Sequence, residues 1–146
     1  MITNGERYPG MADAALAAIA AGPNWKVSKT DYACDPWVIM KDPEVGDYLN
    51  HLGYSDVNPY KIVEITKSGK TCYVQEVEAE RDPNWKPNFV PGGFSAHCTN
   101  NHDQKWVYGK LLPGRMAVRK VKVGWKSAYG RHSLSSNPLK HYDYNF

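Results

Sequence analysis

Cysteine and phenylalanine are scarce in this chain, and long apolar runs are absent from it. The three cysteines, Cys34, Cys72 and Cys98, are too few and too scattered for the disulfide framework of a small secreted protein, so we expect reduced thiols in a cytoplasm. No apolar run approaches the length of a transmembrane helix, so we expect no membrane partner. The alanine-rich run 14–21 follows acidic residues rather than a basic segment, which predicts a helix and not a signal peptide.

The net charge is also small, at +3 over 146 residues. Its distribution is uneven, because residues 1–100 hold nine Lys and Arg against thirteen Asp and Glu, whereas residues 101–146 hold nine against two. This asymmetry predicts a basic face built from the last third of the chain, suited to a phosphate-bearing or acidic partner. The alternative is a solvated strand face without a partner.

The length predicts one domain with a core large enough to fold without disulfides. Within it, residues 1–44 are expected to form a helix and a lead-in segment, and residues 45–146 a β domain. The helix is predicted over Met11–Ala21, because apolar residues spaced three apart share a face and Gly22-Pro23 ends the run. A short strand is expected at 37–40, between two Asp-Pro turn signals.

Alternating apolar and polar residues predict strands in the remainder of the chain. The clearest pair is 60–66 and 71–77, joined as a hairpin in which Gly69 is free to adopt a positive φ. Residues 115–126 are predicted to form the longest strand, with a bulge near Arg119 where the alternation changes phase. Further short strands are expected at 45–49 and 105–108. Short strands, frequent turns and one N-terminal helix predict a mainly β fold, either a small SH3-like barrel or a strongly bent antiparallel sheet.

The segment Arg81–Gln104 shows neither a helical nor a strand period, and its prolines break regular ladders, so we expect a long loop without regular structure. Its aromatic residues argue against a disordered linker. Glycines beside Phe94 would let the backbone approach a ligand closely, although an ordinary turn is the alternative. We predict a pocket here, with ligand-binding candidates Trp85, Phe94, His97, Asn100 and Gln104.

Cations alternate with aromatic rings in the last third of the chain, and such interleaving suits nucleic acids because rings stack on bases while cations neutralise phosphates. The rings of Trp106 and Trp125 are expected in the core, with the lysines of the predicted 115–126 strand on the opposite face. A glycine-bounded turn near residue 130 carries the next candidates. The predicted ligand-binding residues of this region are Lys120, Lys122, Lys126, Arg131 and His132.

No constellation of residues predicts an enzyme. The run 67–71 ends like a phosphate-binding P-loop, but the first glycine of that motif is replaced by Glu64 and the flanks predict strands. His97, Cys98 and His102 could hold zinc or form a thiol nucleophile, but they lack a second ligand pair or an evident orienting group, and a buried thiol in a hydrogen-bonded loop is the simpler interpretation. We therefore expect no cofactor, no bound metal and no catalytic residue.

A series of short motifs occurs in a particular order between residues 45 and 146. The motifs are Tyr54-Ser-Asp56, Pro59-Tyr60, Ile62-Val-Glu-Ile65, Gly69-Lys70, Pro91-Gly-Gly-Phe94, His97, Gln104-Lys105, Gly130-Arg-His132 and Tyr142-Asp-Tyr-Asn-Phe146. In this order they resemble a group of small accessory proteins encoded by tailed bacteriophages and related mobile elements. The resemblance implies an accessory protein that acts in the cytoplasm of the infected bacterial host, and it supplies no catalytic residue.

These observations together predict a non-enzymatic binding protein that engages a nucleic acid, a nucleotide or a host defence or regulatory protein. The basic face and the Arg81–Gln104 loop are expected to lie side by side and to make the contact. Two alternatives stay open. One is a structural virion component, in which the aromatic segment Tyr142–Phe146 docks on a second copy and gives a homo-oligomer. The other is a metal- or thiol-dependent hydrolase centred on His97, Cys98 and His102.

Overall fold

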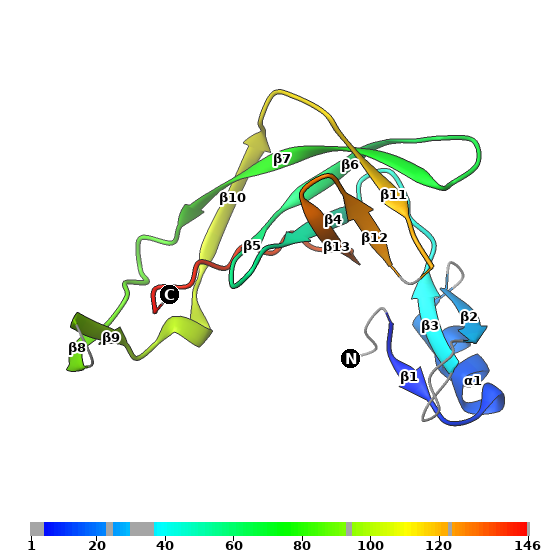
Figure 1. Ribbon diagram of the computed structural model, residues 1–146, viewed down its shortest axis with the longest axis horizontal. Coiled ribbons are helices and arrows are strands. Elements are labelled where there is room, and N and C mark those ends of the chain that lie inside the picture. Colours follow the sequence, from blue (N-terminus) through cyan, green and yellow to red (C-terminus); the bar gives the residue numbers. More distant parts are fainter. Residues whose placement is uncertain (1–4, 23–24, 30–36, 93–94, 123, 146) are drawn as a thin grey trace. The chain divides into compact units, whose positions relative to one another are not determined.

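The computed structural model in Figure 1 describes residues 5–22, 25–29, 37–92, 95–122 and 124–145. The chain divides into two compact units, Met1–Glu44 and Val45–Phe146, and each is described by itself. The predictions for Cys34 and Phe94 concern residues outside the described ranges.

The N-terminal unit is a helix on a small sheet. Helix α1 spans Met11–Ala21, as predicted, and the N–H of Gly22 closes it by donating to the Ala18 carbonyl at 3.3 Å. Two alanines of the helix, Ala14 and Ala18, are buried against tryptophans of the sheet, and their small side chains allow that close approach. The sheet has the antiparallel order β1-β3-β2, with β1 at Arg7–Tyr8, β2 at Trp25–Lys29 and β3 at Trp37–Lys41.

Six antiparallel strands of the second unit close into a barrel. The strands are β4 (Tyr48–Leu52), β6 (Tyr60–Ile65), β7 (Thr71–Arg81), β11 (Met116–Lys120), β12 (Trp125–Ser127) and β13 (Gly130–Ser135). Each strand pairs with the next in this order, and β13 returns to pair with β4, which completes the ring. The short strand β5 (Val57–Asn58) adds to the end of β4. The predicted mainly β fold with a small barrel and a short N-terminal helix is confirmed.

The barrel interior holds one apolar core. Alternate residues of each strand point inward, so every strand of the ring contributes to it. Trp125 is the largest of these side chains and is only 2% exposed, which confirms its predicted place in the core. Burial of such side chains stabilises the fold by about 1.5–3 kcal/mol each. The buried set is Leu49, Ile62, Cys72, Val74, Val118, Trp125 and Leu134.

The prediction of one long strand over 115–126 is wrong. Strand β11 ends at Lys120, and the chain reverses so that the Val121 N–H donates to the Gly124 carbonyl at 3.1 Å. Gly124 adopts φ +90°, a conformation that side chains other than glycine rarely take. Strand β12 then returns antiparallel to β11. The reversal changes which side chains share a face, because residues directly opposed in the hairpin now lie on the same side.

Strand β7 is longer than the barrel needs. Its first residues pair with β11, and its last residues, 77–81, pair with β10 (Trp106–Leu111), so that a two-stranded ribbon leaves the barrel. At the end of this ribbon, β8 (Phe89–Gly92) pairs with β9 (Ser95–Cys98), and a 3-10 turn, η1, follows at Asn101–Asp103.

The segment Arg81–Gln104 is therefore not the structureless loop that was predicted. Pro91 is compatible with β8 because a strand in a two-stranded ribbon has one unpaired edge, where a missing N–H costs nothing.

Candidate functional site

Three cations line up across the outer surface of the barrel. In the register of the sheet, Arg119 of β11 lies opposite Lys126 of β12, and Lys126 lies opposite Arg131 of β13. Side chains directly opposed in antiparallel strands project to the same face, with Cβ atoms about 4.5–5.5 Å apart. All three residues are exposed, whereas their sequence neighbours Val118 and Trp125 are buried. We call Arg119, Lys126 and Arg131 the cation row.

The cation row differs from the lysine face that was expected. Lys126 and Arg131 belong to it, but Lys120 lies opposite Trp125 and so projects to the other side of the hairpin. The Lys120 N–H donates to the Lys70 carbonyl at 2.8 Å. Lys120 and Lys70 both line a second, smaller pocket of about 380 Å³. Lys122 is exposed in the turn between the two strands. The predicted single face of Lys120, Lys122 and Lys126 is wrong, since the strand that defined it is a hairpin.

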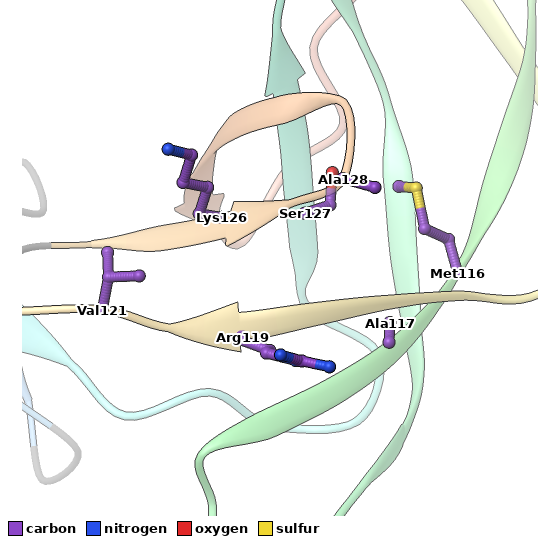
Figure 2. A pocket seen from close by; sticks show the side chains of 7 residues that line it. All are labelled: Met116, Ala117, Arg119, Val121, Lys126, Ser127 and Ala128. Carbon is purple, nitrogen blue, oxygen red and sulfur yellow. The ribbon is translucent and has the colours of Figure 1, made fainter.

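A pocket of about 490 Å³ opens between β11 and β12 beside the cation row. The two strands pair only at Arg119–Lys126 and Lys120–Trp125, and beyond that point they separate. Figure 2 shows the result, with Ala128 and the Met116 side chain approaching each other at one end of the pocket and Val121 at the other. Apolar walls with a few polar groups at the rim are typical of ligand sites. The lining residues are Met116, Ala117, Arg119, Val121, Lys126, Ser127 and Ala128.

His132 was predicted to touch a ligand, but its side chain faces inward and the residue is 4% exposed. Its Nδ1 lies 2.9 Å from the Leu49 carbonyl oxygen, which only accepts hydrogen bonds, so Nδ1 carries the proton. Its Nε2 lies 2.8 Å from the Ser127 hydroxyl oxygen and accepts from that hydroxyl. His132 therefore orients a serine that lines the pocket.

The environment of His132 favours the neutral ring. Burial lowers the pKa of His132 from its ordinary value, the bond to the Leu49 carbonyl partly opposes this, and the nearby His51 lowers the pKa further. The ring centroids of His51 and Tyr60 lie 5.1 and 5.7 Å from that of His132. A neutral imidazole with a fixed tautomer leaves Nε2 free to accept the Ser127 proton.

An exposed aromatic residue lies in the turn that joins the strands of Lys126 and Arg131. Tyr129, in the turn between β12 and β13, is 75% exposed, and its backbone is held from two sides. Its N–H donates to the Ser127 hydroxyl oxygen at 3.2 Å, and its carbonyl accepts from His51 Nε2 at 3.0 Å. Sequence reasoning did not single out Arg119, Ser127 or Tyr129. The available signal was Gly130, whose φ of +126° marks the turn between β12 and β13 that carries Tyr129.

The amide of Gln104 joins the C-terminal tail to the ribbon instead of facing a cavity. Its Nε2 donates to the Asn101 carbonyl and to Asn101 Oδ1, both at 2.9 Å, and to the Tyr142 carbonyl. Its Oε1 accepts from the Trp106 indole and from the Tyr142 N–H, both at 3.0 Å. Every polar atom of this side chain is used within the protein.

Asn100, a second predicted pocket residue, is also used internally. Its Nδ2 donates to the Lys86 carbonyl at 2.8 Å, while its Oδ1 accepts from the Asn88 N–H at 2.8 Å and from the Cys98 thiol at 3.3 Å. These bonds fix the turns on either side of the β8–β9 hairpin. The side chain of His97 is exposed on β9.

Trp85 is buried rather than available for stacking. It is 7% exposed, its indole N–H donates to Asp103 Oδ1 at 3.4 Å, and its ring lies 5.8 Å from that of Tyr144. Phe89 contacts the same tyrosine at 6.3 Å. The C-terminal aromatic residues thus pack within the chain and form a small cluster at the far end of the ribbon.

The expected juxtaposition of the basic face and the Arg81–Gln104 segment is wrong. Figure 1 shows β8 and β9 at the far end of the β7–β10 ribbon, well apart from β11 and β12. The β7–β10 ribbon causes this separation, because the segment with β8 and β9 follows Arg81, at the end of β7 that lies beyond the barrel. The basic face and the Arg81–Gln104 segment therefore do not form one contact surface.

Within the described part of the chain, no group of three His, Cys, Asp or Glu side chains is placed to hold a metal ion. The Cys98 thiol donates to Asn100, and the Cys98 N–H donates to Asn145 Oδ1 at 2.7 Å. No helix in the described ranges is long and apolar enough to cross a membrane.

Comparisons of the chain with family models, with curated proteins and with solved structures give no significant match in any of the three.

Proposed function

We propose that this chain is a non-enzymatic protein that binds single-stranded nucleic acid across strands β11, β12 and β13. The observation that carries the proposal is the cation row, in which Arg119, Lys126 and Arg131 lie side by side on three neighbouring strands. Like charges directly opposed across a sheet are destabilising. An anion that lies over the row would offset this repulsion.

The dimensions of the row suit a polyanion. Neighbouring strands lie about 4.8 Å apart, so the row extends over roughly 10 Å before its long side chains are counted. A linear ligand with regularly spaced phosphates can therefore contact more than one of the cations at once. Arg and Lys contacts to phosphates bind through charge and counterion release, which needs no base sequence.

An exposed tyrosine in the β12–β13 turn favours single strands over duplexes. Tyr129 is 75% exposed there, and bases must be unstacked from their neighbours to lie on such a ring. Sequence-tolerant stacking of this kind contributes about 1–3 kcal/mol per base. The resemblance to accessory proteins of tailed bacteriophages supports a role in the cytoplasm of an infected bacterium.

The proposal is tested by calorimetric titration with an oligothymidylate over a salt series. The double variant Arg119→Ala/Lys126→Ala is compared with Lys105→Ala/Lys110→Ala, which removes the same charge from exposed positions at the β10 ribbon. We expect the first variant to lower the slope of log affinity against log salt by about 1.4, or about 0.7 per lost phosphate contact, and the second to leave it near the wild-type value. Equal losses in both variants would show that net charge, and not the cation row, drives binding.

The contribution of stacking is tested separately. Tyr129→Ala is expected to weaken binding by about 1–3 kcal/mol for single strands, and to have little effect on a duplex of the same length. Tyr142→Ala, at a 48% exposed ring on the C-terminal tail, is the matched control and should bind like the wild type. A Tyr129 variant with unchanged affinity for single strands would remove the reason for preferring them.

A further inference from the structure

Ser127 connects the pocket to a buried titratable group. Ser127 lines the pocket between β11 and β12, and its hydroxyl oxygen is 2.8 Å from His132 Nε2. Figure 2 shows this oxygen at the end of the pocket where Met116 meets Ala128. In the neutral state the hydroxyl donates to the ring, while its lone pairs accept from the Tyr129 N–H. The hydroxyl proton therefore points away from the pocket when His132 is neutral.

A proton on His132 Nε2 reverses this arrangement. Both ring nitrogens then donate, Nδ1 to the Leu49 carbonyl and Nε2 to the Ser127 oxygen. The Ser127 oxygen is already the acceptor of the Tyr129 N–H, so its own proton has to find another acceptor. Rotation about the C–O bond directs that proton toward the pocket, and no covalent bond other than the new N–H is made or broken.

We propose, on the basis of the function above, that the pocket between β11 and β12 is a proton-coupled phosphate subsite. Arg119 and Lys126 supply its charge, and protonation of His132 turns the Ser127 hydroxyl into an additional donor for the bound phosphate. Affinity for a phosphodiester then rises as the pH falls. By thermodynamic reciprocity, a bound phosphodiester raises the pH at which His132 is half protonated.

The groups around His132 are compatible with such coupling. The titratable rings that contact it are His51 from β4 and Tyr60 from β6, and Glu76 of β7 lies opposite Tyr60 in the register. Lys126 and Arg131 project to the outer face next to it. A phosphate placed over these two residues adds negative charge near the buried ring and so favours its protonated form.

The test is the affinity of oligothymidylate between about pH 5.5 and pH 8, a range in which histidine titrates. Neither the phosphodiesters nor the thymine bases change their charge over this range. Ser127→Ala removes the hydroxyl, and Ser133→Ala, at an exposed position on β13, is the matched control. Wild type and Ser133→Ala should bind about tenfold more tightly at the acid end, the effect of one hydrogen bond to a charged acceptor. Ser127→Ala should show a clearly smaller gain, because it lacks the hydroxyl donor.

A second measurement uses only the wild-type protein, so its result does not depend on whether Ser127→Ala folds. The ring proton signals of His132 are followed by NMR against pH, with and without oligothymidylate. A tenfold coupling requires the midpoint to rise by about one pH unit in the bound state. An unchanged midpoint, or equal pH dependence in Ser127→Ala and wild type, overturns the coupling while leaving the binding function standing. Absence of binding at every pH overturns both.

Discussion

Replacement of Gln104 by alanine separates a structural role from a ligand-binding role. Five hydrogen bonds converge on this side chain, two to Asn101, two to the Tyr142 backbone and one to the Trp106 indole. A net hydrogen bond contributes about 0.5–1.5 kcal/mol, and water replaces part of what is lost at this half-buried site. Because the five contacts share one amide, we expect the tail to lose about 2–3 kcal/mol of stability against local opening.

The assay is native-state hydrogen exchange of the tail amides. The Tyr142 N–H donates directly to Gln104, and the Tyr144 N–H donates to Asn101 Oδ1 at 3.1 Å, so both report on the same network. A loss of about 2 kcal/mol corresponds to exchange roughly thirtyfold faster. Amides in the barrel core, such as that of Val118, should keep their rates because the barrel does not depend on the tail network.

Gln75→Ala is the matched control, because its amide makes one long hydrogen bond, 3.3 Å to the Leu112 carbonyl. It should leave exchange at Tyr142 and Tyr144 unchanged. The reasoning is refuted if Gln104→Ala leaves these rates unaltered. It is equally refuted if Gln104→Ala abolishes oligothymidylate binding while the tail stays protected, since Gln104 would then be a ligand contact.

Two further outcomes follow from the buried titratable groups. The folded-state pKa of His132 is lowered, so the unfolded chain binds more protons, and the stability that His132 contributes is present above the unfolded value of 6.5 and is lost as the pH falls through the folded value. Urea melts should show lower stability at pH 5.5 than at pH 7.5, and a flat profile would contradict the neutral buried ring. Burial raises the pKa of Cys72 to about 11, so the peptide containing Cys72 should resist alkylation at pH 8 until the protein is unfolded. Rapid modification in the native state would show that the barrel interior opens.

Local signals were sufficient for the elements that depend on neighbouring residues. The helix Met11–Ala21 and the hairpin around Gly69 were predicted correctly because a helix stop and a turn glycine mark them in the sequence itself. The barrel was predicted from the number of short strands and turns, which is a property of the whole chain.

The elements that were missed depend on long-range pairing. The alternation of residues 115–126 changes phase near Arg119, and periodicity alone did not distinguish the predicted bulge from the reversal that pairs β11 with β12. The cation row depends on the register of three strands, and register is not visible in a single strand. The amide of Gln104 meets Tyr142, 38 residues away, and no local pattern links the two.

The position at which a single-stranded oligonucleotide binds distinguishes a site on the barrel from a site on the β8–β9 hairpin. Oligothymidylate is titrated into uniformly labelled protein, and the backbone amide shifts are mapped onto the barrel. The cation row predicts changes concentrated in β11, β12 and β13, with the largest at Arg119, Lys126 and Tyr129, and none in the β8–β9 hairpin. Changes centred on β8 and β9 instead, or no changes at low salt, would contradict a nucleic-acid site on the barrel.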